Sequence, residues 1–167
     1  MGPFKHTVDD GLDLRKAVFE CMYTLLDSCL DKVEIFEYLN NVESGLKDTY
    51  DIKMLTFLIL IRLSDLCPSA ILQHLESIVG LLKETCFAKL KSNSVKQEYE
   101  KQDELRRSAI RAFVAIYRIR DADKNSYAND LMNSINSHHE LKLLHESVIE
   151  NNKMSKKLQP SMEVDLS

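Results

Sequence analysis

The feature that most constrains this chain is the spacing of its apolar residues between positions 14 and 29. Each has another apolar residue three or four positions away, and the set is Leu14, Ala17, Val18, Cys21, Met22, Leu25, Leu26 and Cys29. That spacing places them on one stripe of an α-helix. The chain has only four Gly and three Pro, so long helices are permitted elsewhere as well. We therefore expect an all-α protein.

Three more helices are expected before residue 92. The first has Asp31 as its N-cap and ends at Gly45 in a left-handed stop, with an inner face made of Val33, Phe36, Leu39 and Val42. The next begins at Asp51 and is apolar nearly all round, so we expect neighbours to bury it. Pro68 then opens a helix that extends towards Leu90.

Polar residues at 92–94 mark a break, after which the helical pattern resumes up to Tyr117. We expect a surface ion pair between Asp103 and Arg107, and a short helix over 127–135. Ser137 and Glu140 have the spacing of a capping box for one further helix. We expect the domain to span 13–150, preceded by an N-terminal segment over 1–12 and followed by a disordered tail over 151–167.

Three of the expected helices carry the same short pattern of an acid, an apolar residue and a base. The three matches are Asp13-Leu14-Arg15, Asp51-Ile52-Lys53 and Glu104-Leu105-Arg106. The pattern resembles the opening of HEAT repeats, in which the acid caps a helix and the base reaches the neighbouring repeat. The expected fold is a HEAT-type α-solenoid of about three helical hairpins plus a C-terminal helix.

Charge and hydropathy exclude several classes of partner. A formal charge of −4 provides no attraction for nucleic acid. The longest apolar run, 54–61, is too short to span a membrane, and residues 1–10 contain no signal sequence. The four cysteines show no metal-ligand spacing, so we expect reduced core thiols in preference to a zinc site or disulfides. We expect a cytoplasmic and nuclear protein.

The sequence contains no motif for nucleotide binding, ester hydrolysis or zinc proteolysis, so we expect no enzyme, cofactor or small-molecule substrate. His138, His139 and His145 lie close enough to bind a metal, but a solvated helix end explains them better. The acids between 98 and 104 alternate with bases, as on a solvated face. The basic residues Lys89, Lys91 and Lys96 either meet an acidic protein surface or are a charged loop without a partner.

The segment from Phe4 to Val8 differs from the rest of the chain. Its residues, Phe4, Lys5, His6, Thr7 and Val8, alternate and favour β structure. Two interpretations remain open, a frayed terminus or half of a β-hairpin.

Three blocks of sequence resemble the C-terminal region of the cullin-associated, neddylation-dissociated family, also described as TATA-binding-protein-interacting proteins. They are 2–29, which begins Gly-Pro-Phe-Lys-His-Thr-Val-Asp-Asp-Gly-Leu-Asp, then 45–72 and 93–109. Together they cover well over half of the chain, and the likeness fades after Asp121.

This resemblance implies a HEAT-repeat module that binds the N-terminal region of an unmodified cullin and competes there with the substrate adaptor. It also implies that Phe4, Lys5, His6, Thr7 and Val8 belong to a projecting β-hairpin that contacts the partner. The chain lacks the long upstream array of the family, so we expect weakened binding and an uncovered first helix. Two alternatives remain: a scaffold for a different, transcription-associated partner, and an enzyme with a site between helices.

Overall fold

A computed structural model describes residues 9–158, and within this range the chain forms eight α-helices and no strand. The helices are α1 (Leu12–Ser28), α2 (Ile35–Leu46), α3 (Tyr50–Leu66), α4 (Pro68–Gln73), α5 (Leu75–Phe87), α6 (Lys96–Tyr117), α7 (Ser126–Ser137) and α8 (His139–Leu158). Short 3-10 helices follow α1 and α6, at Leu30–Lys32 and Ala122–Lys124. The predicted all-α class is confirmed.

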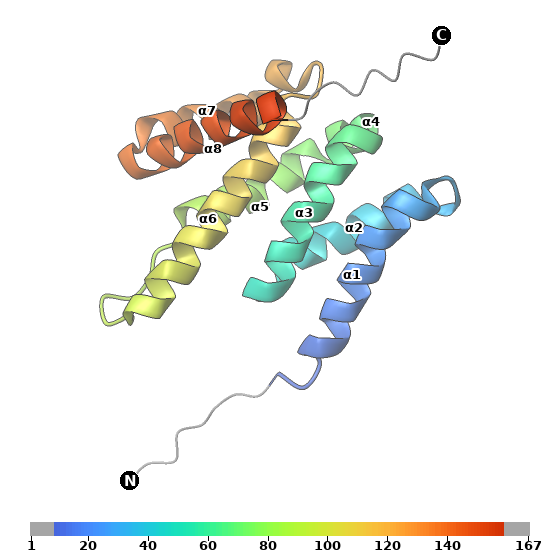
Figure 1. Cartoon of the computed structure of the whole chain (residues 1–167), viewed down its shortest axis with the longest axis horizontal. Coiled ribbons are helices and arrows are strands. Elements are labelled where there is room, and N and C mark those ends of the chain that lie inside the picture. The colour runs from blue at the N-terminus through green and yellow to red at the C-terminus, as the bar shows by residue number, and fades with distance from the viewer. Residues whose placement is uncertain (1–8, 159–167) are drawn as a thin grey trace.

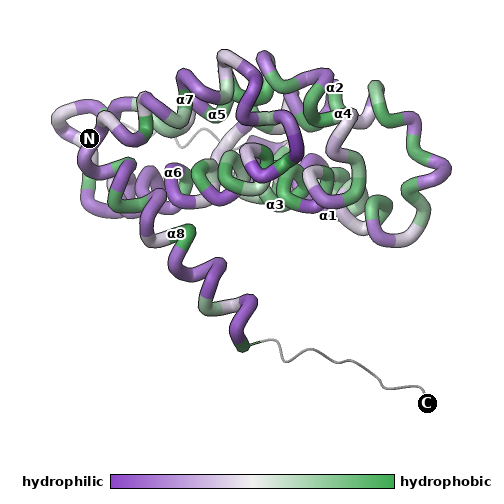
Figure 2. Tube along the Cα trace, turned by 90° about the horizontal axis from the view of Figure 1, so that it is seen from above, coloured by the Kyte–Doolittle hydropathy of each residue, from purple (hydrophilic) through white to green (hydrophobic). Residues whose placement is uncertain are grey.

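The helices form two layers (Figures 1 and 2). In one layer α1, α3, α6 and α8 contact one another in chain order, and in the other α2, α5 and α7 do the same. The layers are joined where α2 packs on α3, α5 on α6 and α7 on α8. Stacked hairpins of this kind share one continuous core. The predicted solenoid is therefore confirmed, with α1–α2, α3–α5 and α6–α7 as three hairpins and α8 as the additional helix.

The first two hairpins repeat with a period of 38 residues, the distance from Asp13 to Asp51. Helices α1 and α3 each contain 17 residues, and each is followed by a cysteine, Cys29 or Cys67, whose N–H donates to a leucine carbonyl. Arg15 of the first copy forms an ion pair with Asp48, in the turn before α3, with 2.9 Å between Nε and Oδ2. The expected reach of this base towards the next repeat is thus confirmed.

The third match to the repeat pattern is not a helix opening. Helix α6 begins at Lys96, two turns before Glu104, and Glu98 accepts the backbone N–H of Val95 at its start. The match still aligns α3 with α6. When Asp51 is paired with Glu104, the buried residues of α3 fall on buried residues of α6. The pairs are Thr56 with Ala109, Leu60 with Phe113, and Leu63 with Ile116.

The expected ends of α2 were wrong. Residues 30–32 form a 3-10 turn, and Glu34, not Asp31, caps α2 by accepting the N–H of Glu37 at 2.7 Å. Gly45 lies inside the helix with negative φ, so it is not a left-handed stop. Phe36 is 54% exposed and does not belong to the inner face. The N-cap lies three residues later than expected because an N-cap residue needs an extended backbone, and after the 3-10 turn only Val33 and Glu34 have one.

The helix expected from Pro68 towards Leu90 is divided at His74. His74 ends α4 and precedes α5, and its Nδ1 lies 3.1 Å from Oε1 of Glu43 in α2. Helix α5 ends at Phe87, so Leu90 lies in the connection to α6. A tertiary contact therefore coincides with a break that the local pattern does not indicate.

Three expectations for the C-terminal part also need correction. The Ser137 hydroxyl donates back to Asn133 within α7, so Ser137 and Glu140 do not form a capping box. Asp103 lies 4.0 Å from Arg106 and not against Arg107. Helix α8 continues to Leu158, so the boundary of the tail at 151 was too early; residues 159–167 lie outside the described range. The last turns of α8 project from the body in Figure 2.

Candidate partner-binding surface

The segment predicted to contact a partner lies outside the described residues. Phe4, Lys5, His6, Thr7 and Val8 precede residue 9, where the structural description begins. Their role therefore stays a prediction. The packing of the helices reveals a different candidate surface, on α3.

The outer face of α3 carries an apolar hollow of about 310 Å³. Its floor comprises Met54, Leu55, Phe57, Leu58 and Ile61. Leu58 is 52% exposed, whereas Phe57, its neighbour in the chain, is buried on the core side. The apolar circumference of α3 was expected to be covered by neighbours, and that expectation was wrong for this side. The apolar residues of this surface are thus evident in the sequence, but they were expected to belong to the core.

The helices on either side of α3 do not have this apolar stripe. In the repeat register, the positions equivalent to Met54 and Leu58 are Lys16 and Glu20 in α1. Lys16 and Glu20 line the same hollow, as do Ser108 and Arg111 on the α6 side. Apolar residues thus occur in the central helix, where the flanking helices have polar residues. A stripe that the core does not use is a candidate contact for another molecule.

A second, charged hollow of about 420 Å³ continues the first along α6. The two share Met54, Ser108 and Arg111, and the charged hollow adds the residues Glu100, Asp103, Glu104 and Arg107. An apolar centre with a charged rim is the usual composition of a protein–protein contact. This surface, comprising the two hollows, is called the α3 surface below.

A second exposed apolar stripe runs along α1, at Leu14, Val18, Cys21 and Leu25. Leu14 is 71% exposed, while Ile52, its equivalent in α3, is fully buried. The same holds for the other three positions, whose equivalents are Thr56, Ile59 and Leu63. The stripe is therefore the face on which a solenoid helix receives the preceding hairpin.

Side chains that could suggest chemistry have structural roles in the described range. Tyr50 donates its hydroxyl proton to Glu104, and this bond raises the pKa of Tyr50 to about 12. His138 lies edge-on to Phe87, with 5.8 Å between ring centroids. Burial raises the pKa of the Cys86 thiol to about 12. Across residues 9–158, no group of three or more His, Cys, Asp or Glu side chains is placed to hold a metal.

Among the helices of the described range, none combines the length and the apolar character needed to cross a bilayer.

Comparison with known proteins identifies the family. A family model described as TATA-binding protein interacting (TIP20) matches residues 1–148. The chain belongs to this family. The match covers all three hairpins and reaches into α8, so the helices that form the α3 surface lie within the matched residues.

Curated relatives are similar to most of this chain. Cullin-associated NEDD8-dissociated protein 2 of Rattus norvegicus is 56% identical over 148 residues, which is 89% of this chain and 12% of that protein. Cullin-associated NEDD8-dissociated protein 1 of Drosophila melanogaster is 55% identical over the same shares, and that of Arabidopsis thaliana is 49% identical over 79% of this chain and 11% of its own. The chain thus spans about an eighth of the length of these relatives.

Proposed function

We propose that this chain is a non-catalytic protein-binding module that contacts the N-terminal region of a cullin in competition with the cullin's adaptor. The names of the relatives describe cullin association, which supports the choice of partner. The observation that carries the binding role is the α3 surface, where an apolar stripe that the core does not use is exposed inside a charged rim.

The α3 surface suits a helical partner. Met54, Leu58 and Ile61 follow the helical spacing of one face, so they form a continuous apolar strip along the hollow, on which the apolar face of a partner helix can pack. Fully burying an exposed leucine contributes about 1.5–3 kcal/mol, and Leu58, which is 52% exposed, would contribute about half of that. The rim carries charges of both signs, with Arg107 and Arg111 beside three acidic residues, so complementary charges on the partner would set its orientation.

Affinity should be modest for this chain by itself. The relatives are about seven times as long as this chain, and a long solenoid can contact its partner at several places. Loss of linked contacts lowers the overall affinity by a factor of about 10² to 10⁴. We therefore expect a dissociation constant in the micromolar range or weaker, on the order of 1 μM to 1 mM.

The test is calorimetric titration of the chain into an unmodified cullin N-terminal domain, with and without its bound adaptor. Binding that the adaptor suppresses supports competition at the adaptor site. If binding is the same with and without the adaptor, the cullin is a partner but the two proteins do not compete for one site. Absence of heat at two temperatures with millimolar protein contradicts cullin binding by this region, because burial of apolar surface makes the enthalpy depend on temperature.

The family description favours a second candidate, a scaffold for a transcription-associated partner, because it refers to interaction with the TATA-binding protein. Titration of the chain with the TATA-binding protein tests this candidate. Binding there, together with no binding to the cullin domain, would favour the scaffold. Either partner agrees with a cytoplasmic and nuclear location, which we propose and which imaging of the tagged chain would test.

A further inference from the structure

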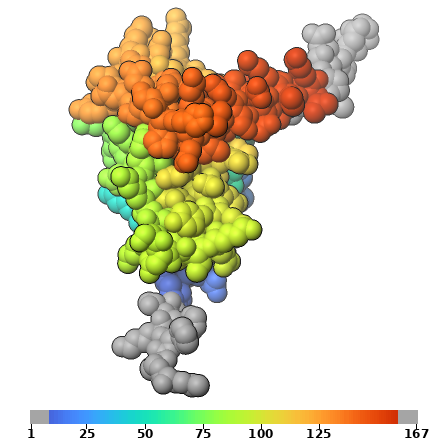
Figure 3. All heavy atoms as spheres, turned by 90° about the vertical axis from the view of Figure 1, so that its left-hand side faces the viewer, coloured from blue at the N-terminus to red at the C-terminus, as the bar shows by residue number. Residues whose placement is uncertain are grey.

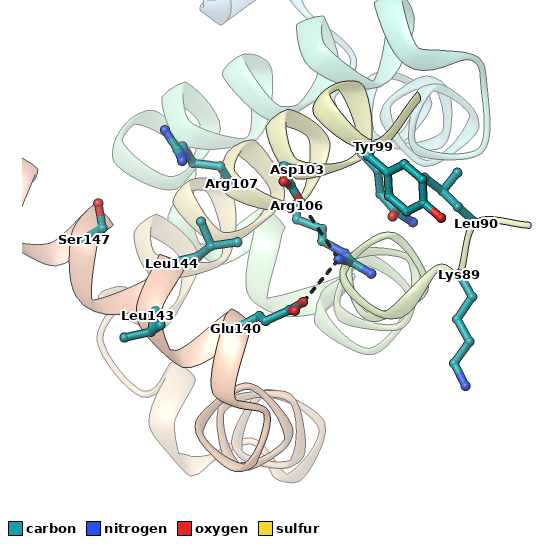
Figure 4. A pocket seen from close by; sticks show the side chains of 11 residues that line it. Lys89, Leu90, Tyr99, Asp103, Arg106, Arg107, Glu140, Leu143, Leu144 and Ser147 are labelled. Atoms are coloured by element: carbon teal, nitrogen blue, oxygen red, sulfur yellow. Dashed lines mark ion pairs between the residues drawn. The ribbon is translucent and has the colours of Figure 1, made fainter. Parts of the chain in front are cut away.

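A groove distinct from the apolar hollow of α3 lies where α6, α8 and the residues after α5 meet (Figure 4). It has a volume of about 690 Å³. In Figure 3 α7 and α8 lie at the top of this face, above α6 and the segment that leads into it. In Figure 4 Arg106 lies in the middle of the groove, with Arg107 and Lys89 on opposite sides of it.

Arg106 is held in the groove with few strong partners. Its side chain is 14% exposed, and its Nη2 donates to the backbone carbonyl of Ala88 at 2.9 Å. Its Nη1 lies 4.0 Å from Asp103 Oδ1 and 3.9 Å from Glu140 Oε2, both beyond hydrogen-bond distance. Its Nε is buried and makes no hydrogen bond within the described residues. A guanidinium has five N–H donors, so Arg106 has capacity for a closer carboxylate.

The two acids beside Arg106 are poorly placed to satisfy it. The side chains of Asp103 and Glu140 are 68% and 73% exposed, so water screens both contacts. Either acid can turn towards solvent without losing a hydrogen bond to Arg106. A carboxylate from another molecule could therefore replace them, and it would gain a bidentate contact with Arg106 that they do not make.

The surroundings of the groove favour a negatively charged, partly apolar ligand. A neighbouring hollow of about 550 Å³ shares Lys89, Leu90 and Gln102 with it. Together the two hollows are lined by six basic side chains, Lys47, Lys53, Lys89, Lys101, Arg106 and Arg107, against four acidic ones, Glu84, Glu98, Asp103 and Glu140. This local excess of positive charge contrasts with the negative charge of the whole chain. Tyr99 and Leu143, each about half exposed, add apolar area at the edge.

We propose that the Arg106 groove binds an acidic segment of a partner protein. One carboxylate of the segment pairs with Arg106, and a neighbouring apolar side chain packs on Leu143 and Tyr99. Lys89 adds long-range attraction. The groove would thus give the module a second contact, in addition to the apolar hollow of α3.

The test uses a fluorescein-labelled peptide in which Glu and Leu alternate, with fluorescence anisotropy as the readout. We expect binding that weakens as sodium chloride is added and that is lost when Gln replaces Glu in the peptide. Arg106→Gln should weaken binding by about tenfold, because a charge-assisted bidentate contact is removed. Glu140→Gln should strengthen binding by about two- to fivefold, because it removes a competing negative charge.

Two surface variants keep the test valid if Arg106→Gln disturbs the fold. Lys89→Glu reverses an exposed charge at the groove, whereas Lys32→Glu makes the same change in the exposed turn after α1. The proposal predicts weaker binding for Lys89→Glu only. Equal weakening by both variants, equal binding of the Gln peptide, or no binding with millimolar peptide would overturn it. None of these results depends on whether the chain binds a cullin.

Discussion

Gly45 of α2 lies directly against the ring of Phe19 in α1. A Cβ at position 45 would come within 2.7 Å of Cζ of Phe19 and would also overlap the hydroxyl of Thr56 in α3. Thr56 cannot easily move away, because it is fully buried and its hydroxyl donates to the Ile52 carbonyl at 2.7 Å. This one position therefore sets how closely the first hairpin stacks on the second.

Gly45→Ala should destabilise the protein, although alanine is the better helix former. The overlap with Phe19 and Thr56 should cost about 1–3 kcal/mol, as overpacking does elsewhere. Gly80 is the matched control, because it lies in helix α5 with no neighbouring atom within 4 Å of an added Cβ. Gly80→Ala should stabilise by up to about 1 kcal/mol. Urea unfolding measures both, and equal effects of the two substitutions would contradict the close approach.

Asp48 should make the stability depend on pH in the acid range. Its hydrogen bonds from Arg15 hold the pKa of its carboxyl below the ordinary value of 3.8. A lowered pKa in the folded state stabilises the protein fully above about pH 4, and the contribution is lost as the pH falls through the lowered pKa. Asp48→Asn should be less stable at neutral pH and should lose less stability on acidification. Parallel pH profiles of the free energy of unfolding would contradict this.

The cysteines should react with alkylating reagents in an order set by exposure. Cys21 is exposed on α1, whereas Cys86 is fully buried and burial raises its pKa to about 12. The thiolate is the reactive form, so Cys86 should be protected in the folded protein and react only on unfolding. Mass spectrometry after brief treatment with iodoacetamide gives the order. Modification of Cys86 at the rate of Cys21 would show that the core around α5 opens readily.

The exposed stripe on α1 should cause self-association at high concentration. Leu14→Lys combined with Val18→Lys should lower the average mass measured by light scattering and change stability by no more than about 0.5 kcal/mol. The control is Ile52→Lys, at the position equivalent to Leu14 but fully buried. It should cost more than about 4 kcal/mol, because it buries an unpaired charge. Similar stability of the two variants would contradict the repeat register.

Much of the fold could be predicted because the local patterns of the first repeats agree with their packing. The spacing of Asp13 and Asp51 gives the period, and the helical spacing of the apolar residues gives the extents of α1 and α3. It does not give the buried face of α1, because only Met22 and Leu26 of the eight residues in its stripe are buried. Periodicity could not separate Phe57 from Leu58, since both belong to a helix that is apolar nearly all round. One faces the core and the other faces solvent, and only the positions of α1 and α6 decide which.

The missed boundaries depend on contacts between distant residues. The break at His74 coincides with its contact to Glu43, 31 residues earlier, which no local pattern contains. Arg106 was noted only as part of a repeated pattern, yet its partners Ala88 and Glu140 come from two other segments. The predicted contact segment Phe4–Val8 lies outside the described residues, so its role is still a prediction.

The most direct test of the proposed function is calorimetric titration of an unmodified cullin N-terminal domain with the chain and two variants, Leu58→Asp and Phe36→Asp. Leu58 and Phe36 are equally exposed, at 52% and 54%, but they lie in opposite layers, on α3 and α2. We predict that Leu58→Asp weakens binding by at least about tenfold and that Phe36→Asp leaves it unchanged. Unchanged binding by Leu58→Asp, or a loss confined to Phe36→Asp, would contradict the α3 surface as the cullin contact.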